Sequence, residues 1–229
     1  DALALPLVAI SAHVLKLVRR VGVHRLPLSK AQLMRTGVFP IRDHYYEPLF
    51  NSSALTTPLD AERDLPGIDW NVEGQLDLLR QFTFSAELSG IGSQKIDDTT
   101  FHFGNGAFES GDAEFLYNMI RTKKPRRIFE IGSGNSTLIA RHAVIRNQHE
   151  DPKYQCKHIC IEPYEMPWLE RTGVTVVREK VESMSPTFFD ELDRNDLLFI
   201  DTSHIIRPQG DVLFEYLTLL PRLKKGVVV

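Results

Sequence analysis

The stretch RRIFEIGSGNSTLIA, residues 126–140, decides how the chain folds. Its apolar residues up to Ile131 predict a short buried strand, Gly132 and Gly134 predict a tight turn, and the residues from Ser136 onward predict a helix. A strand, a glycine turn and a helix in this order are typical of the carboxyl edge of an open parallel sheet. Backbone N–H groups of such a turn can face a ligand. We therefore expect a small-ligand site at this turn.

Strands and helices alternate after the turn. This alternation predicts parallel pairing with helical crossovers, hence an α/β, Rossmann-like sheet that is mainly parallel and carries helices on both faces. The chain stops inside an apolar run, so we also expect C-terminal strands of this sheet to be missing from the sequence. The expected strands are 128–131, 158–162, 174–177, 196–201 and the start of one at 227–229, and the expected helices are 136–147, 186–192 and 211–220.

The first half of the chain gives weaker signals. Helical patterns occur at about 28–35, 72–84 and 110–121. An aromatic, proline-bracketed segment at 39–50 suits either a lid over a pocket or a plain packing segment. The predicted organisation is an N-terminal helical and loop extension, residues 1–106, followed by a ligand-binding domain, residues 107–229.

The first predicted helix is amphipathic. Lys16, Arg19 and Arg20 lie off its apolar stripe, and the segment lacks the basic start of a signal peptide. Such a helix packs on its own domain, on a second copy to give a homo-oligomer, or on a membrane surface, and we expect no stable membrane insertion. The stripe consists of Leu7, Ile10, Val14, Leu17, Val18 and Val21.

Composition limits the function classes. The chain has 42% hydrophobic residues, 25% charged residues and a formal net charge of −3, which argues against a nucleic-acid partner. Two cysteines, Cys156 and Cys160, build no disulfide framework and favour a reducing compartment. With His158 they share one face of a predicted strand, but zinc ligands usually come as CxxC or with a second cluster, so we expect no metal site.

The residues around the turn favour one kind of ligand. A dinucleotide site would read G-x-G-x-x-G, whereas the sixth position here is Thr137. Glu130 precedes Gly132 by two residues, and its carboxylate would repel a pyrophosphate but attract an ammonium group. Glu162, at the end of the next strand, is placed to accept hydrogen bonds from ribose hydroxyls. An adenosine ligand with a cationic amino group therefore fits better than NAD.

Three segments together resemble the class I S-adenosylmethionine-dependent methyltransferases. More narrowly, they resemble the small-molecule O-methyltransferase-like branch of bacterial type. The resemblance covers roughly residues 108–229, and its specificity lies in three motifs that follow strand ends in the right order. The motifs are EIGSGNS at 130–136, IEP at 161–163 and LFIDTSH at 198–204.

The resemblance implies S-adenosylmethionine as the cofactor and a small-molecule acceptor. Glu162 would hold the ribose, Val181 and Glu182 would contact adenine, and the turn would line the methionine moiety. Asp201 and His204 would be the catalytic residues over the reactive methyl group, with His204 as the candidate base. The cofactor-binding residues that it implies are Glu130, Gly132, Ser133, Gly134, Asn135, Ser136, Glu162, Val181, Glu182 and Asp201.

Alternatives remain beside this interpretation. Glu130 could form a structural salt bridge with Arg127 or Arg141, His204 could be merely structural, and Asp201 could bind a divalent metal. At the level of the protein, the alternatives are a non-catalytic binding or scaffolding module and an NAD-dependent oxidoreductase. A glycan at the Asn135 sequon would block the turn, which favours a cytoplasmic location.

Overall fold

The computed structural model describes residues 2–41, 57–58, 60–62, 65–164 and 166–229. Most of the predicted aromatic segment 39–50 lies outside the described residues. The chain divides into two compact units, Asp1–Ile68 and Asp69–Val229. The domain boundary expected from the sequence, between residues 106 and 107, falls within the second unit and stays a prediction.

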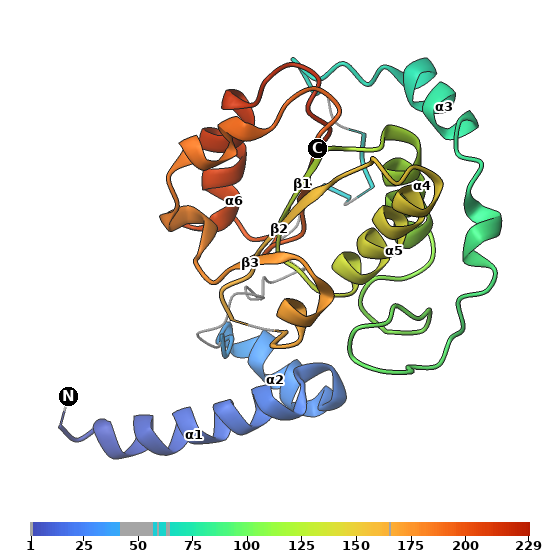
Figure 1. Ribbon diagram of the computed structural model, residues 1–229. Coiled ribbons are helices and arrows are strands. Elements are labelled where there is room, and N and C mark those ends of the chain that lie inside the picture. The colour runs from blue at the N-terminus through green and yellow to red at the C-terminus, as the bar shows by residue number, and fades with distance from the viewer. Residues whose placement is uncertain (1, 42–56, 59, 63–64, 165) are drawn as a thin grey trace. The chain divides into compact units, whose positions relative to one another are not determined.

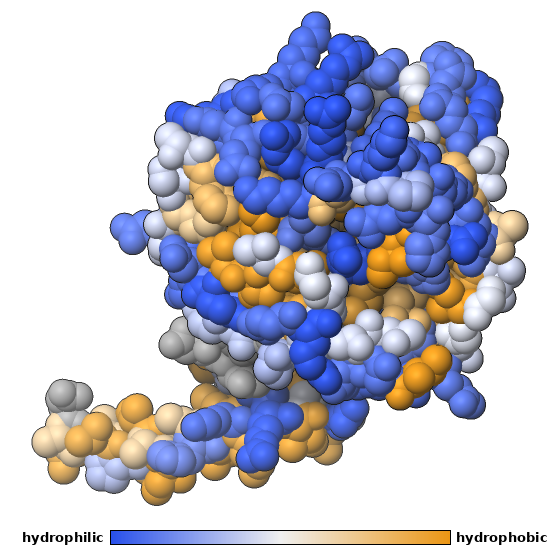
Figure 2. All heavy atoms as spheres, in the orientation of Figure 1, coloured by the Kyte–Doolittle hydropathy of each residue, from blue (hydrophilic) through white to orange (hydrophobic). Residues whose placement is uncertain are grey.

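The first unit consists of α1 (Leu5–Val21), the 3-10 helix η1 (Val23–Arg25) and α2 (Pro27–Thr36), so both helices expected here are confirmed. Proline stands in the first turn of α1 and of α2, where its missing N–H costs nothing. Gly37 ends α2 in the left-handed region with φ +69°. Apolar side chains gather along α1 (Figure 2), and none of its residues is buried. Among the described residues, no helix is both long enough and apolar enough to cross a membrane.

A parallel sheet organises the second unit. Its strands are β1 (Arg127–Ile131), β2 (Lys157–Ile161), β3 (Thr175–Val177) and β4 (Leu197–Ile200), in the order β3-β2-β1-β4. All three strand pairs are parallel, and Val228 adds an isolated parallel bridge to Leu197. The expected α/β class and parallel pairing are therefore confirmed.

Helices cover both faces of the sheet. In Figure 1, α4 (Asp112–Lys123) and α5 (Asn135–Glu150) lie on one side of the strands and α6 (Asp211–Phe214) on the other. Because side chains alternate along a strand, Ile128 enters the core under α4 and α5, whereas Phe129 and Ile131 enter the core on the opposite face. The remaining helices of this unit are α3 (Val72–Arg80), η3 (Ser85–Leu88), η4 (Leu169–Thr172), η5 (Val181–Ser183), η6 (Pro186–Glu191), η7 (Glu215–Leu219) and η8 (Leu220–Arg222).

Two helices differ from the expectation. The helix expected at 72–84 ends at Arg80. Beyond it, the Phe84 N–H donates to Asn118 Oδ1 of α4 at 2.9 Å instead of to a carbonyl of the same helix. The helix expected at 211–220 is present, but it is not α-helical throughout. Its first turn is α-helical and then widens into the π-helix η7. Such π turns often occur at functional sites.

A buried arginine holds the flank of this unit together. The Arg121 side chain on α4 is fully buried, and its guanidinium donates two hydrogen bonds of 2.9 Å to the Glu87 carboxylate on η3. It also donates to Asn147 and Glu150 of α5, and its cation lies 4.3 Å from the centre of the Phe84 ring. The bidentate pairing makes this buried charge tolerable and ties η3 to both helices.

Candidate cofactor and active site

The glycine turn follows β1 directly and is tight for a steric reason. Gly132 has φ +78°, and a Cβ atom there would lie 2.0 Å from the main-chain oxygen of Asp201. Its N–H donates to the Ile161 carbonyl of β2 at 3.1 Å. Only glycine accepts both this backbone conformation and this close approach. The turn is thus packed between the ends of β2 and β4.

The strand order makes this position the switch point of the sheet. Starting from β1, the chain first adds β2 and β3 on one side and then crosses to add β4 on the other. Ligands of open α/β sheets bind in the crevice that such a reversal opens at the carboxyl edge. Glu162 follows β2 and Asp201 follows β4, so the two carboxylates flank the turn from its two sides.

Glu162 lies against the turn. Its carboxylate accepts hydrogen bonds from the Ser133 N–H at 3.3 Å and from the Tyr164 N–H at 3.0 Å. The side chain is half-buried, which leaves part of it open to solvent. A carboxylate in this position can accept hydrogen bonds from vicinal hydroxyls, as expected from the sequence.

Glu130 lies on the face of the sheet that α5 covers, and its side chain is buried to 1% exposure. One oxygen accepts from Ser136 Oγ and the other from Thr137 Oγ1 at 2.9 Å. On β2, His158 Nε2 lies 3.0 Å from Glu130, and the Cys160 thiol donates at 3.4 Å. In this structure Glu130 therefore braces the start of α5 from inside the protein. Its predicted contact with the methionine moiety stays a prediction.

The same cluster has the residue types of a metal site. The ligand atoms of Glu130, His158 and Cys160 lie within 4.8 Å of one another, close enough for one ion. Burial raises the pKa of the Cys160 thiol, as does the neighbouring Glu130 charge, which keeps the thiol a neutral donor. Ser136 and Thr137 already occupy the Glu130 carboxylate. We interpret the cluster as a hydrogen-bonded support beneath the turn.

Thr137 explains why the sixth position of the turn motif is not glycine. Its hydroxyl accepts the Gly134 N–H at 3.1 Å while it donates to Glu130. One side chain thus caps the first turn of α5 and connects it to β1. In the sequence, Thr137 was visible only as a departure from a dinucleotide motif. Its capping role depends on the buried Glu130 carboxylate, whose position could not be inferred from the sequence alone.

Asp201 and His204 form a pair at the end of β4. His204 Nε2 lies 2.8 Å from Asp201 Oδ1, and both side chains are largely exposed. His204 has φ +57°, a left-handed conformation that a non-glycine residue adopts at a cost. The loop that holds it is fixed by Asp211, whose carboxylate accepts the Ser203 N–H at 2.9 Å and its hydroxyl at 2.7 Å. The structure thus brings the two expected catalytic residues together beside the turn.

A second acidic group lies behind this loop. Glu215, the first residue of η7, is 1% exposed and accepts a hydrogen bond from Thr202 Oγ1 at 3.2 Å. Its other carboxylate oxygen is buried without a hydrogen-bond partner. Burial raises the pKa of Glu215 to about 7, and the negative charges of Asp211 and Glu182 act in the same direction. The sequence analysis missed this residue, and its only signal was a charge inside the apolar run from Val212 to Leu220.

The remaining expected residues occupy different positions around the turn. Asn135 and Ser136 form the first turn of α5, where Asn135 is half-buried. Val181 is 4% exposed and packs in the core with Phe189, and Glu182 beside it is half-buried. The adenine contact expected for Val181 and Glu182 stays a prediction.

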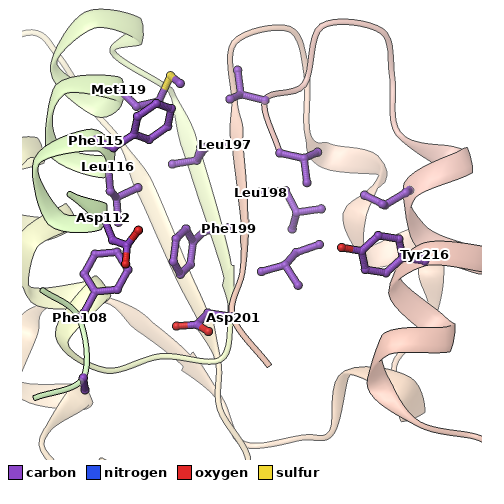
Figure 3. Close-up of a pocket in the computed structure, with 15 residues that line it drawn as sticks. Phe108, Asp112, Phe115, Leu116, Met119, Leu197, Leu198, Phe199, Asp201 and Tyr216 are labelled. Atoms are coloured by element: carbon purple, nitrogen blue, oxygen red, sulfur yellow. The ribbon is translucent and has the colours of Figure 1, made fainter. Parts of the chain in front are cut away.

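A pocket of about 610 Å³ runs along β4 (Figure 3). In this view, side chains of α4 line one side and Tyr216 of η7 projects from the other, with Asp201 near one end. Asp112 and Asp201 are the carboxylates of an otherwise apolar lining. Because this lining suits apolar side chains, we assign the cofactor to the turn and not to this pocket. The labelled lining residues are Phe108, Asp112, Phe115, Leu116, Met119, Leu197, Leu198, Phe199, Asp201 and Tyr216.

Comparisons with known proteins match the part of the chain that contains this site. Residues 129–229 match a family model described as a methyltransferase domain. An uncharacterized protein of Archaeoglobus fulgidus is 27% identical over 171 residues, which make up 69% of this chain and 75% of that protein. Among solved structures, the SAH-bound methyltransferase PaMTH1 of Podospora anserina is similar with a TM-score of 0.30 and 16% identity, over 72% of this chain and 80% of that chain.

The matched region begins within β1 and contains the turn, the end of β2 and the Asp201–His204 pair. Residues 129–229 therefore form a class I S-adenosylmethionine-dependent methyltransferase domain, with S-adenosylmethionine as its cofactor. The match concerns the class of enzyme and its cofactor. It does not extend to the methylated atom of the acceptor, to the identity of the acceptor or to the bacterial branch.

The turn has features that fit this cofactor. Ser133 Oγ is buried near the Cys160 thiol and makes no close hydrogen bond to a described residue, so it can donate to or accept from a ligand. A Cβ atom at Gly134 would lie 3.8 Å from Met166 Cε and, among the described residues, within 4 Å of no main chain beyond its own neighbours, so no described main chain lies in that direction from the turn. The Glu162 carboxylate lies beside the Ser133 N–H. These residues can hold a ligand that has both hydroxyl and charged groups.

Proposed function

We propose that this domain transfers the methyl group of S-adenosylmethionine to a hydroxyl oxygen of a small-molecule acceptor, with His204 as the base. The observation that carries the proposal is the 2.8 Å contact between His204 and Asp201 beside the turn that fits the cofactor. An amine that arrives unprotonated needs no base, whereas a hydroxyl has a proton to lose. A paired histidine therefore favours oxygen over nitrogen.

The residues of the turn hold the cofactor in this proposal. Glu162 accepts hydrogen bonds from the ribose hydroxyls, and the Ser133 hydroxyl bonds the part of the ligand nearest the turn. Bound S-adenosylmethionine supplies an electrophilic methyl group on a sulfonium. What the protein adds is mainly position, since methyl transfer needs an in-line approach of the nucleophile.

The histidine pair explains how the acceptor proton leaves. With its proton on Nε2, His204 donates to the Asp201 carboxylate, and Nδ1 keeps the lone pair that accepts the proton of the acceptor hydroxyl. Asp201 fixes this tautomer and stabilises the imidazolium that forms. The same hydrogen bond to Asp201 orients the ring.

Calorimetric titration tests the cofactor site on its own. The full chain should bind S-adenosylhomocysteine and not NAD. Glu162→Gln should weaken this binding by about 10- to 100-fold, the usual effect of losing hydrogen bonds to a charged group. Glu179→Gln, which changes an exposed carboxylate outside the proposed site, should leave binding unchanged. Equal affinities of the two variants would contradict the ribose assignment.

A transfer assay tests the chemistry. Labelled S-adenosylmethionine is incubated with a panel of small phenols and alcohols and with the matching amines, and product is measured for each. His204→Gln should lower kcat by about 10²- to 10⁴-fold without changing the affinity for S-adenosylhomocysteine. His149→Gln, at the exposed end of α5, should retain wild-type kcat. Full activity of His204→Gln would eliminate the base, and binding without any transfer would favour a non-catalytic module.

A further inference from the structure

The helix α1 has an apolar face that the described residues of its own unit leave exposed. None of the residues of α1 is buried. Five of the large apolar residues that repeat at helical spacing are between 43% and 69% exposed. Figure 2 shows apolar side chains gathered along this helix. These residues are Leu7, Ile10, Val14, Leu17 and Val21.

Opposite this stripe, the second half of α1 is basic, whereas the first half carries the exposed Leu5 and Val8. His13, Lys16, Arg19 and Arg20 lie off the apolar stripe at helical spacing. The excess of positive charge extends through α2, because residues 2–41 contain six Lys and Arg and no Asp or Glu. The whole chain, in contrast, has a formal net charge of −3. Positive charge is therefore concentrated in the helices of the first unit.

The charge selects among the partners that could cover the apolar face. A second copy packed on the apolar stripe would cover it but leave both basic faces in water, with no acidic residue in residues 2–41 to pair with them. A nucleic acid would pair with the basic face but leave the apolar face in water. A surface of anionic lipid satisfies both faces, because its headgroups attract Lys and Arg while its acyl chains take up apolar side chains.

We infer that α1 binds a membrane surface containing anionic lipid, with its axis in the plane of the headgroups. The apolar face of Ile10 and Val14 enters the acyl boundary, and Lys16 and Arg20 remain at the level of the headgroups. This attachment would bring the methyltransferase domain to a lipid surface, and it does not depend on which acceptor that domain uses.

Co-sedimentation of the full chain with vesicles tests the inference. Vesicles of phosphatidylcholine alone are compared with vesicles of equal parts phosphatidylcholine and phosphatidylserine. The protein should bind the anionic vesicles much more tightly, and added salt should weaken this binding. The double variant Lys16→Gln, Arg20→Gln should weaken binding about fivefold per charge. The double variant Ile10→Ser, Val14→Ser should weaken it by about tenfold or more.

Controls separate this surface from general effects of charge. The double variant Lys153→Gln, Lys225→Gln removes the same charge from exposed positions of the other unit and should bind as the wild type does. Circular dichroism and S-adenosylhomocysteine binding confirm that each variant is folded. Equal binding to neutral and anionic vesicles, or no binding to either, would overturn the inference. A dimer in sedimentation equilibrium that Ile10→Ser, Val14→Ser abolishes, without vesicle binding by the wild type, would assign the face to a second copy instead.

Discussion

Replacing Glu215 with glutamine should remove a large part of the pH dependence of stability. Glu215 is 1% exposed. Among the residues that the structure describes, only Thr202 donates a hydrogen bond to it, and one of its oxygens has no partner. Its pKa is raised to about 7, from an ordinary value of 4.5, mainly by burial. The native protein therefore holds this proton over a pH range in which the unfolded chain has released it.

The sign and size of the effect follow from this difference. Below about pH 4.5 both states are protonated and Glu215 contributes nothing to the pH dependence. As the pH rises toward 7 only the native state keeps the proton, so the free energy of unfolding falls, and above 7 the loss is complete. The difference between a pKa of about 7 and one of 4.5 corresponds to about 3 kcal/mol. The wild type should lose this amount, and Glu215→Gln should not.

Urea denaturation followed by circular dichroism, at a series of pH values from about 5 to 8, measures the effect. The amide of glutamine leaves a donor or an acceptor without a partner, so the pH dependence is the quantity to compare and not the stability at one pH. Glu179→Gln, at an exposed position, should follow the wild-type curve. If Glu215→Gln also follows that curve, the burial of a titrating carboxyl group behind the Asp201–His204 loop is refuted.

Three further predictions concern other parts of the second unit. Arg121→Leu should lower the free energy of unfolding by about 3–5 kcal/mol in the same denaturation assay, because it leaves the partners of a buried charge unpaired. Arg126→Leu, at an exposed position, should change that free energy by less than about 0.5 kcal/mol. Gly132→Ala should destabilise the protein far more than Gly106→Ala. Both glycines have positive φ, but a Cβ meets nothing within 4 Å at Gly106, so its cost should be only the conformational one of about 1–2 kcal/mol. Burial raises the pKa of the Cys156 thiol to about 11. Alkylation of Cys156 at neutral pH should therefore be slow until urea unfolds the chain. Fast alkylation of Cys156 in the native protein would contradict its burial.

The sheet could be predicted from the sequence because its signals are local. Short apolar runs bounded by turn residues gave the four strands, and alternation with helices gave their parallel pairing. The glycine turn carried its own conformational requirement, and Glu162 and Asp201 were placed by their position after strands. These residues needed only the rule that parallel strands end at one edge.

The surroundings of Glu130 could not be predicted, since they depend on contacts distant in sequence. The expectation of an ammonium contact considered Glu130 beside its own turn. In the structure, the pairing of β1 with β2 brings His158 and Cys160 to the same face, and α5 covers all three. A prediction of this cluster requires the strand register and the covering helix together.

The arginine contact and the π turn were missed for a related reason. Arg121 seemed to end a helix, and its burial depends on carboxylates from η3 and α5 that lie far along the chain. The pattern from residue 211 to residue 220 is compatible with a regular α-helix, and the widening at Glu215 involves Thr202 in the loop after β4. Such features follow from packing between elements and have little signal within one element.

The close packing of Gly132 against Asp201 has a mechanical consequence. A backbone oxygen lies where any side chain of residue 132 would begin, so the cofactor turn and the loop after β4 share a contact without a compliant side chain between them. A displacement of one backbone is transmitted directly to the other. The main chain at the end of β4 would therefore move together with the glycine turn. A substitution at residue 132 would therefore disturb both strand ends at once, β1 through its own turn and β4 through the main chain of Asp201.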